Sequence, residues 1–210
     1  MRSGNVYRYG KMLLVGVAMV VILLAADQGR KLILSGLYNH QTEQYLSFWS
    51  GQQNKEHFTV SARNLEVAMA GAEKGIELLP DSAEQYVLKA RLLWWAEHYT
   101  ENGETPDTNR AAILKSWQAA VRLRPSWPYS WTEYGMALAQ QSIIDERFAA
   151  ALTLANQQGP WERDVLEASA TVGKHYQGWL SPALTETLQA STERLIQLYS
   201  RRAKQMGVYK

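Results

Sequence analysis

Apolar and polar side chains alternate along this chain with the period of an α-helix in almost every segment. An uninterrupted apolar run occupies residues 12–26. After it, apolar residues return every three or four positions, and hardly any stretch alternates with period two. A period near 3.6 is typical of helices with one buried face, whereas a period of two is typical of strands. The pattern therefore predicts an all-α protein.

Turn and capping residues divide the chain after this run into a series of helices. Gly159-Pro160 and Ser181-Pro182 each join a residue that ends or caps a helix to a proline suited to the first helical turn. Asp81 and Glu84 have the spacing of a capping box. The predicted helices cover residues 61–79, 82–99, 108–123, 127–141, 143–158, 160–175 and 182–204, with a polar loop at 100–109.

The apolar run at 12–26 is the candidate membrane segment. It is shorter than the roughly 20 residues that cross a bilayer. Extension back to residue 6 reaches that length if Arg8 and Lys11 extend their charges to the interface. A cleaved signal peptide and a buried core helix are the alternatives. Because no pair of small residues stands at the spacing that cleavage requires, we favour an uncleaved single anchor helix.

Basic residues lie before the anchor, so the N-terminus is expected to stay in the cytoplasm. The remainder of the chain would then lie in the periplasm, tethered to the inner membrane. Apolar residues continue at helical spacing through residues 33–48. The anchor helix either continues outward there or gives way to a short amphipathic helix.

A short phrase recurs in the predicted helical region: a leucine, one further residue and a proline, with a large aromatic six positions after the proline. The copies are Leu78-Leu79-Pro80 with Tyr86, Leu123-Arg124-Pro125 with Trp131, and a degenerate Gln158-Gly159-Pro160 with Leu166. Such self-similarity is typical of stacked helical hairpins. The small residues of Gly71-x-x-x-Gly75 are expected to allow close packing within a hairpin.

These residues resemble the tetratricopeptide repeat, an antiparallel helix pair of about 34 residues. The pattern of its first helix is clearest at Trp131, Tyr134, Gly135 and Leu138, and the pattern of its second helix at Ala68, Ala72, Gly75 and Pro80. The resemblance covers residues 61–175. It implies a stack of hairpins whose inner surface is lined by the first helix of each pair and which holds partner molecules.

The chain is accordingly expected to have four parts. Residues 1–35 would form a cytoplasmic tip and the transmembrane helix, and residues 36–60 a connecting amphipathic segment. Residues 61–178 would form the tetratricopeptide-like repeat domain, and residues 179–210 a C-terminal helix with a basic tail. The predicted fold class is an all-α chain with one N-terminal transmembrane helix and a helical-hairpin repeat domain.

The chain is also similar to the VpsP-type polysaccharide biosynthesis proteins, single-span proteins encoded among bacterial exopolysaccharide genes. The residues that carry this resemblance, besides the basic start and apolar run, are Leu92-Leu93-Trp94-Trp95, Arg124-Pro125-Ser126-Trp127-Pro128 and Gly159-Pro160-Trp161-Glu162. The resemblance implies a part in exopolysaccharide production. It provides no catalytic residue that could be carried over to this sequence.

The charge distribution argues against a nucleic-acid partner. The net charge is +2, but residues 1–31 hold five basic side chains against Asp27, whereas residues 32–210 hold 17 basic and 19 acidic side chains. A slightly acidic body lacks the basic face that phosphate backbones require. The chain has no cysteine, which removes disulfides and thiolate metal sites from consideration.

Catalytic and cofactor-binding motifs were not found. The four histidines, at positions 40, 57, 98 and 175, have no paired spacing that suits a metal. No glycine-rich phosphate loop, nucleophile elbow or zinc-protease motif is present. We therefore expect no enzyme activity, no cofactor and no metal.

The eight tryptophans point to a binding surface instead. Helical spacing places Trp94, Trp117 and Trp131 in the core, and Trp95 must face a different way from its neighbour. The repeat geometry puts a set of aromatic and polar residues toward a concave partner groove: Arg91, Trp94, Trp95, Tyr129, Met136, Gln140, Lys174 and His175. Such a set could hold a peptide or stack on a sugar. Alternatively, one of the chain's own helices fills the groove.

The leading functional hypothesis is a membrane-anchored periplasmic scaffold that assists exopolysaccharide synthesis or export by docking other proteins of that pathway, with glycan as a further candidate partner. The alternative is a general periplasmic assembly factor or chaperone that binds envelope proteins. A subunit of a glycan-processing enzyme is a remote third hypothesis.

Overall fold

The computed structural model describes residues 3–100 and 107–209, and in these ranges every regular element is helical. The predicted loop at 100–109 therefore lies largely outside the described residues. The helices are α1 (Ser3–Gln52), α2 (Ala62–Leu78), α3 (Ala83–Tyr99), α4 (Asp107–Leu123), α5 (Pro128–Gln140), α6 (Glu146–Gln158), α7 (Arg163–His175), α8 (Pro182–Leu198) and α9 (Ser200–Gln205), with a short 3₁₀ turn at Gln177–Trp179. The all-α prediction is confirmed.

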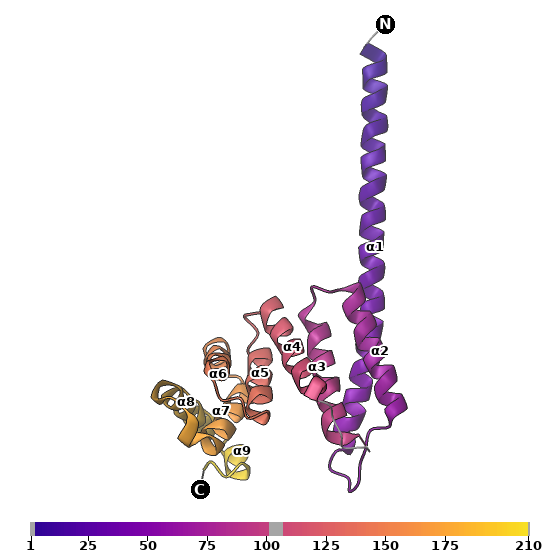
Figure 1. The fold of residues 1–210 in the computed structure, drawn as a ribbon. Coiled ribbons are helices and arrows are strands. Elements are labelled where there is room, and N and C mark those ends of the chain that lie inside the picture. The colour runs from indigo at the N-terminus through magenta and orange to yellow at the C-terminus, as the bar shows by residue number, and fades with distance from the viewer. Residues whose placement is uncertain (1–2, 101–106, 210) are drawn as a thin grey trace.

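α1 is a single unbroken helix of 50 residues. Of the two arrangements predicted for residues 33–48, continuation of the helix is the one observed. The N-terminal part of α1 extends well beyond the other helices (Figure 1), and its apolar side chains from Met12 to Leu24 are exposed. Among the described residues, α1 is the one helix that is long and apolar enough to cross a membrane, judged by length and composition alone.

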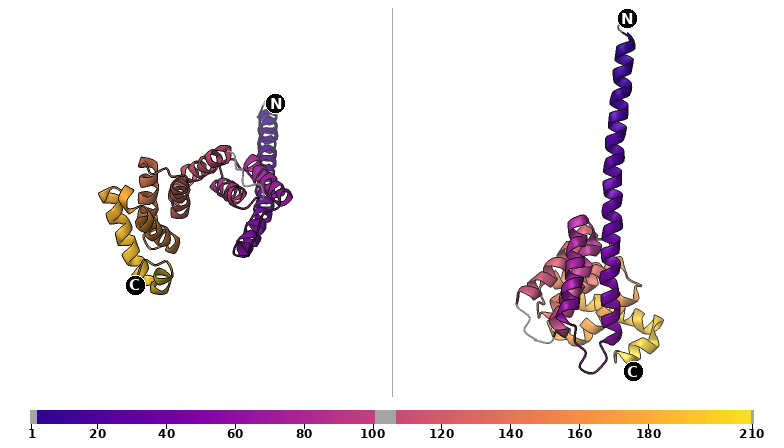
Figure 2. Two further views of the ribbon diagram at one scale, coloured as in Figure 1. Left: turned by 60° about the horizontal axis from the view of Figure 1, so that its bottom comes forward. Right: turned by 90° about the vertical axis from the view of Figure 1, so that its right-hand side faces the viewer.

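Consecutive helices form four antiparallel hairpins, α1 with α2, α3 with α4, α5 with α6 and α7 with α8. The hairpins stack along an arc, which is visible in the left view of Figure 2. α1 contacts α3, and α5 contacts α7, so these first helices of the pairs follow one side of the stack. This order of helix pairs is the tetratricopeptide-like arrangement that the sequence predicted. α1 supplies the first helix of the first hairpin.

Three apolar cores support the part of the stack that the structure describes, and the smallest joins α7, α8 and α9 around Leu166 and Leu195. The largest one joins α3 to α8 around Trp117, Leu138 and Phe148. The remaining one joins α1, α2 and α3 around Trp49, which is 1% exposed, and Trp95. The outer part of α1 is therefore packed into the repeat domain and does not act as a flexible linker.

The two glycines of α2 allow it to lie close against α1 and α3, as predicted. A Cβ added to Gly75 would lie 2.1 Å from Oε1 of Gln85, and one added to Gly71 would lie 3.3 Å from Oγ1 of Thr42. Gln85 is 1% exposed, and its Nε2 donates a hydrogen bond of 2.7 Å to Oγ of Ser35. A polar contact thus joins α1 to α3 at the place where α2 has no side chain.

The recurring proline phrase has a hydrogen-bonding cause. Tyr86 donates its hydroxyl to the carbonyl oxygen of Pro80 at 3.0 Å, and Nε1 of Trp131 donates to the carbonyl oxygen of Pro125 at 2.7 Å. The aromatic at the sixth position therefore satisfies a carbonyl in the turn between hairpins. Leu166, in the third copy, cannot donate in this way, and Arg194 of α8 donates to the carbonyl oxygen of Pro160 instead, at 3.5 Å.

Several predicted helix ends were wrong. Asp81 does not cap α3, because Ser82 stands at the N-cap and makes no side-chain capping bond. α7 begins at Arg163 rather than Pro160, because residues 159–162 form a turn in which the Glu162 amide donates a hydrogen bond of 3.1 Å to the Gly159 carbonyl oxygen. The last predicted helix is divided at Tyr199 into α8 and α9.

Candidate functional site

Two adjoining hollows, with volumes of about 330 and 410 Å³, lie between α3 and α5 on the side that the first helices line. They share Arg91, Trp117 and Glu133, and we call them together the inner groove. α3 and α5 make almost no direct contact with each other, because α4 packs against both. Trp117 of α4, 3% exposed, therefore forms part of the floor.

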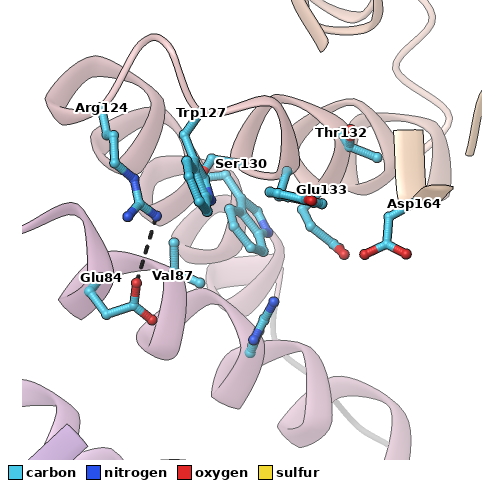
Figure 3. Close-up of a pocket in the computed structure, with 11 residues that line it drawn as sticks. Glu84, Val87, Arg124, Trp127, Ser130, Thr132, Glu133 and Asp164 are labelled. Atoms are coloured by element: carbon cyan, nitrogen blue, oxygen red, sulfur yellow. Dashed lines mark ion pairs between the residues drawn. The ribbon is translucent and has the colours of Figure 1, made fainter. Parts of the chain in front are cut away.

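One half of the inner groove is charged (Figure 3). Glu84 of α3 pairs with Arg124 at 3.6 Å, and the guanidinium of Arg124 lies 4.4 Å from the ring centroid of Trp127. Trp127 is 41% exposed. The aromatic ring and the ion pair together make a wall that a partner can reach from solvent.

Glu133 of α5 and Asp164 of α7 lie in the same half with their carboxylates turned toward each other (Figure 3). Neither carboxylate forms a hydrogen bond or ion pair with any side chain that the structure describes. Water reaches the Glu133 side chain, but surrounding protein atoms remove part of its hydration. This desolvation raises the pKa of the Glu133 carboxyl above its usual value, while Arg91 lowers it and Asp164 raises it further.

Tyr129 borders the charged half and donates its hydroxyl to the Glu162 carboxylate. The hydrogen bond raises the pKa of Tyr129 to about 12, with smaller contributions from burial and from the negative charges of Glu162 and Asp164. The phenol is thereby held neutral as a donor to a fixed acceptor. It shapes the wall of the groove and does not function as a base.

The other half of the inner groove is aromatic and apolar. Nε1 of Trp94 donates to Oε1 of Gln140 at 3.1 Å, a contact that crosses the groove from α3 to α5. His98 stacks on Trp94 with ring centroids 4.4 Å apart. Met136 lies beside them and contributes a flexible apolar surface.

The structure brings together five of the predicted groove residues in the aromatic half: Arg91, Trp94, Trp95, Met136 and Gln140. A sixth, Tyr129, lies in the charged half with Arg91. The predicted residues of the groove therefore come from two adjacent first helices, α3 and α5.

Lys174 and His175 do not join this groove. Lys174 lines a separate hollow near the C-terminus and donates to the carbonyl oxygen of Met206 at 3.0 Å. His175 is exposed and bonds to the carbonyl of Thr171. The reason is that α7 reaches the groove with its first turn, at Asp164, whereas these two residues belong to its last turn.

Both adjacent tryptophans were predicted to line the groove, and Trp94 also to pack in the core, but the structure buries Trp95 more deeply than Trp94. Trp95, predicted to face away from the core, is 6% exposed and packs against Trp49 and Tyr99, with centroid distances of 5.8 and 4.5 Å. Only its edge reaches the groove. Trp94, predicted as a core residue, is half-buried and spans the groove. α1 is the cause, since it covers the Trp95 side of α3.

Sequence reasoning missed Glu133, Asp164, Trp117 and Trp127 as groove residues. Glu133 could have been found, because it lies four residues after Tyr129 and three before Met136 and therefore shares their helix face. Asp164 could not, since the first turn of α7 is placed by the turn after Gly159. Among the described residues, no group of three or more His, Asp or Glu side chains could hold a metal ion.

No family model matches this sequence, and no curated protein matches it either. Among solved structures, a crystal structure of MamA is similar with a TM-score of 0.49 and 13% identity, covering 78% of this chain and 81% of that one. A second MamA structure has a TM-score of 0.46 and 12% identity, covering 85% and 94%. YrrB, described as a TPR protein with an unusual peptide-binding site, has a TM-score of 0.32 and 16% identity, covering 74% and 97%.

Proposed function

We propose that this protein is a membrane-anchored helical-repeat scaffold that assists exopolysaccharide biosynthesis or export by holding partner proteins in the inner groove. The body would lie in the periplasm and α1 would tether it to the inner membrane. The protein would act by bringing partners together at the membrane, with no chemical step of its own.

The inner groove is the observation that carries this proposal. Folding leaves Glu133 and Asp164 facing each other without a cationic partner among the described side chains. Next to them, Trp94 and Met136 leave apolar surface open to solvent. Carboxylates beside apolar surface suit a protein segment that brings both a cation and an apolar side chain. In protein interfaces, a few buried aromatic anchors surrounded by polar contacts contribute most of the binding energy.

α1 supports the membrane part of the proposal. Its large apolar side chains from Met12 to Leu24 are 55–70% exposed. Lipid would remove this surface from water. Packing of α1 into the body from Ser35 onward would hold the groove at a set distance from the bilayer. An alkaline phosphatase reporter fused after the last residue should be active, and activity of a cytosolic reporter at that position would contradict the topology.

The docking part is tested with the double variant Trp94→Ala/Glu133→Gln in the full-length, membrane-embedded protein. We expect it to lose the partners that the wild-type protein retains after chemical crosslinking and affinity purification, and cells that carry it to secrete less polysaccharide. The matched control is Trp179→Ala/Glu66→Gln, because both side chains are exposed and lie away from the groove. Equal recovery of every partner by both variants would contradict docking in the inner groove.

Half-buried Met136 beside an aromatic wall also favours the alternative of a general assembly factor, since methionine adapts to many apolar surfaces. The two functions differ in what the partners are. A scaffold should retain the same few polysaccharide-pathway proteins, whereas a chaperone should retain many envelope proteins and release them after they fold.

A further inference from the structure

A second groove lies on the opposite side of α3 from the inner groove. Its volume is about 830 Å³, and its lining includes Ile76 of α2, Tyr86 and Lys89 of α3, and Lys115 and Arg122 of α4. We call it the outer groove. It exists because α2 and α4 make almost no direct contact, whereas the equivalent helices α6 and α8 do touch. The outward face of α3 is therefore left as a floor between two walls.

The charge of the outer groove is positive. Lys115 and Arg122 are exposed, and neither forms an ion pair with any described residue. Lys89 adds a third cation, partly neutralised by Glu73 at 3.3 Å. No acidic side chain among the described residues lines this hollow. The inner groove, by contrast, is of mixed charge, because Arg91 and Arg124 line it together with the carboxylates of Glu84, Glu133 and Asp164.

The spacing of the cations indicates an extended ligand. Lys115 and Arg122 are seven residues apart on α4, which places them on one face and about 10 Å apart along the helix axis. In an extended peptide of the polyproline II type, with three residues per turn, side chains three residues apart lie on the same face and are separated by roughly 9 Å. Ala119 lies between the two cations along α4, and Ala112 and Ile76 add further apolar lining to the groove.

The hydrogen-bonding groups of the groove favour a peptide over a sugar polymer. Three of the groove's donors are already used within the protein. The Tyr86 hydroxyl donates to the carbonyl oxygen of Pro80, and the Ser116 hydroxyl donates to the carbonyl oxygen of Ala112 at 2.8 Å. Nε2 of Gln118 donates to the hydroxyl of Tyr134 at 2.9 Å. A glycan needs many partners for its hydroxyl groups, and these three are already engaged. Carboxylates and apolar side chains, in contrast, find cations and apolar surface that are free.

We propose that the outer groove binds an extended acidic segment of a protein partner, with two carboxylates at Lys115 and Arg122 and an apolar side chain between them. This site is separate from the inner groove. A scaffold with two such sites can hold two different partners on opposite sides of α3 at the same time.

The proposal is tested with full-length protein in detergent micelles and a fluorescein-labelled extended peptide that carries two glutamates three residues apart with leucine between them. Fluorescence anisotropy should show binding that weakens as salt rises. Lys115→Glu/Arg122→Glu should weaken it about tenfold or more, and Lys115→Gln/Arg122→Gln by a smaller factor, because reversal adds repulsion to the lost ion pairs. Circular dichroism checks that each variant keeps its helices, and the Gln pair serves if the reversed pair does not fold.

The matched control is Arg63→Glu/Arg201→Glu, which changes the net charge equally at exposed sites outside both grooves. It should bind the peptide as the wild type does, and so should the inner-groove variant Trp94→Ala/Glu133→Gln. The proposal is overturned if the wild type does not bind the peptide, if the control pair weakens binding as much as the Lys115 and Arg122 pair, or if a lysine-for-glutamate peptide binds equally well. Tighter binding of oligogalacturonate than of the peptide would overturn the choice of a peptide.

Discussion

Substitution of Gly75 by alanine tests how tightly the anchor helix is built into the repeat domain. The added Cβ would lie 2.1 Å from Oε1 of Gln85 and 3.3 Å from Oδ1 of Asn39. Gln85 must move, and it is 1% exposed and held to Ser35 by the 2.7 Å hydrogen bond. Forcing a methyl group into a packed site costs about 1–3 kcal/mol.

Loss of the buried Gln85–Ser35 hydrogen bond adds about 1–3 kcal/mol. The higher helix propensity of alanine recovers about 1 kcal/mol. Gly75→Ala is therefore expected to lower the free energy of unfolding by about 1–5 kcal/mol. The control is Gly36→Ala in α1, where a Cβ would meet nothing within 4 Å, and which should stabilise the protein by about 0.5–1 kcal/mol.

Urea unfolding in detergent, followed by tryptophan fluorescence, measures both variants, since Trp49 and Trp95 lie in the core that joins α1 to the body. Gln85→Ala added to Gly75→Ala should recover part of the loss, because it removes the atom that the new methyl group meets. If Gly75→Ala is as stable as Gly36→Ala, the close packing of α1, α2 and α3 described above is wrong.

Three further substitutions test local features. Trp131→Phe removes the hydrogen bond to Pro125 and should lower the melting temperature by about 2–4 °C, from a loss of about 1 kcal/mol measured by circular dichroism. Tyr129→Phe should remove from the ultraviolet pH titration one tyrosine that ionises near pH 12. Because the folded state raises this pKa, the stability contributed by the Tyr129–Glu162 bond should be present below about pH 10 and lost between about pH 10 and about pH 12. Asn156→Ala leaves two buried serine hydroxyls without their partner and should cost about 2–4 kcal/mol in urea unfolding, and retention of wild-type stability would contradict that network.

The helical fold could be predicted because its signals are local. Helix starts are marked by side chains that accept hydrogen bonds from backbone amides, as Ser61, Asp145 and Ser181 do at α2, α6 and α8. The helical period between these caps can be recognised without knowledge of any tertiary contact. The capping box predicted from Asp81 was wrong because Ser82, one residue later, stands at the N-cap of α3. A one-residue shift of that kind depends on the turn between hairpins and not on the capping residues alone.

The candidate site could be predicted only where one helix face determines it. Arg91, Tyr129, Met136 and Gln140, which the repeat geometry placed on the inner side of α3 and α5, do line the hollows between these helices. Trp95 was misplaced because its surroundings come from α1, which lies some fifty residues away in sequence and has no spacing signal that links it to α3. The outer groove was not predicted at all, since it arises from the separation of α2 and α4, which no sequence pattern encodes.

Photocrosslinking in intact cells tests docking in the inner groove most directly. A benzophenone amino acid placed at position 133 should give discrete crosslinked products with one or a few other proteins, and the same residue at position 179, which is exposed and away from the groove, should not. Absence of products from position 133, or the same products from both positions, would contradict the central claim that this surface holds partners.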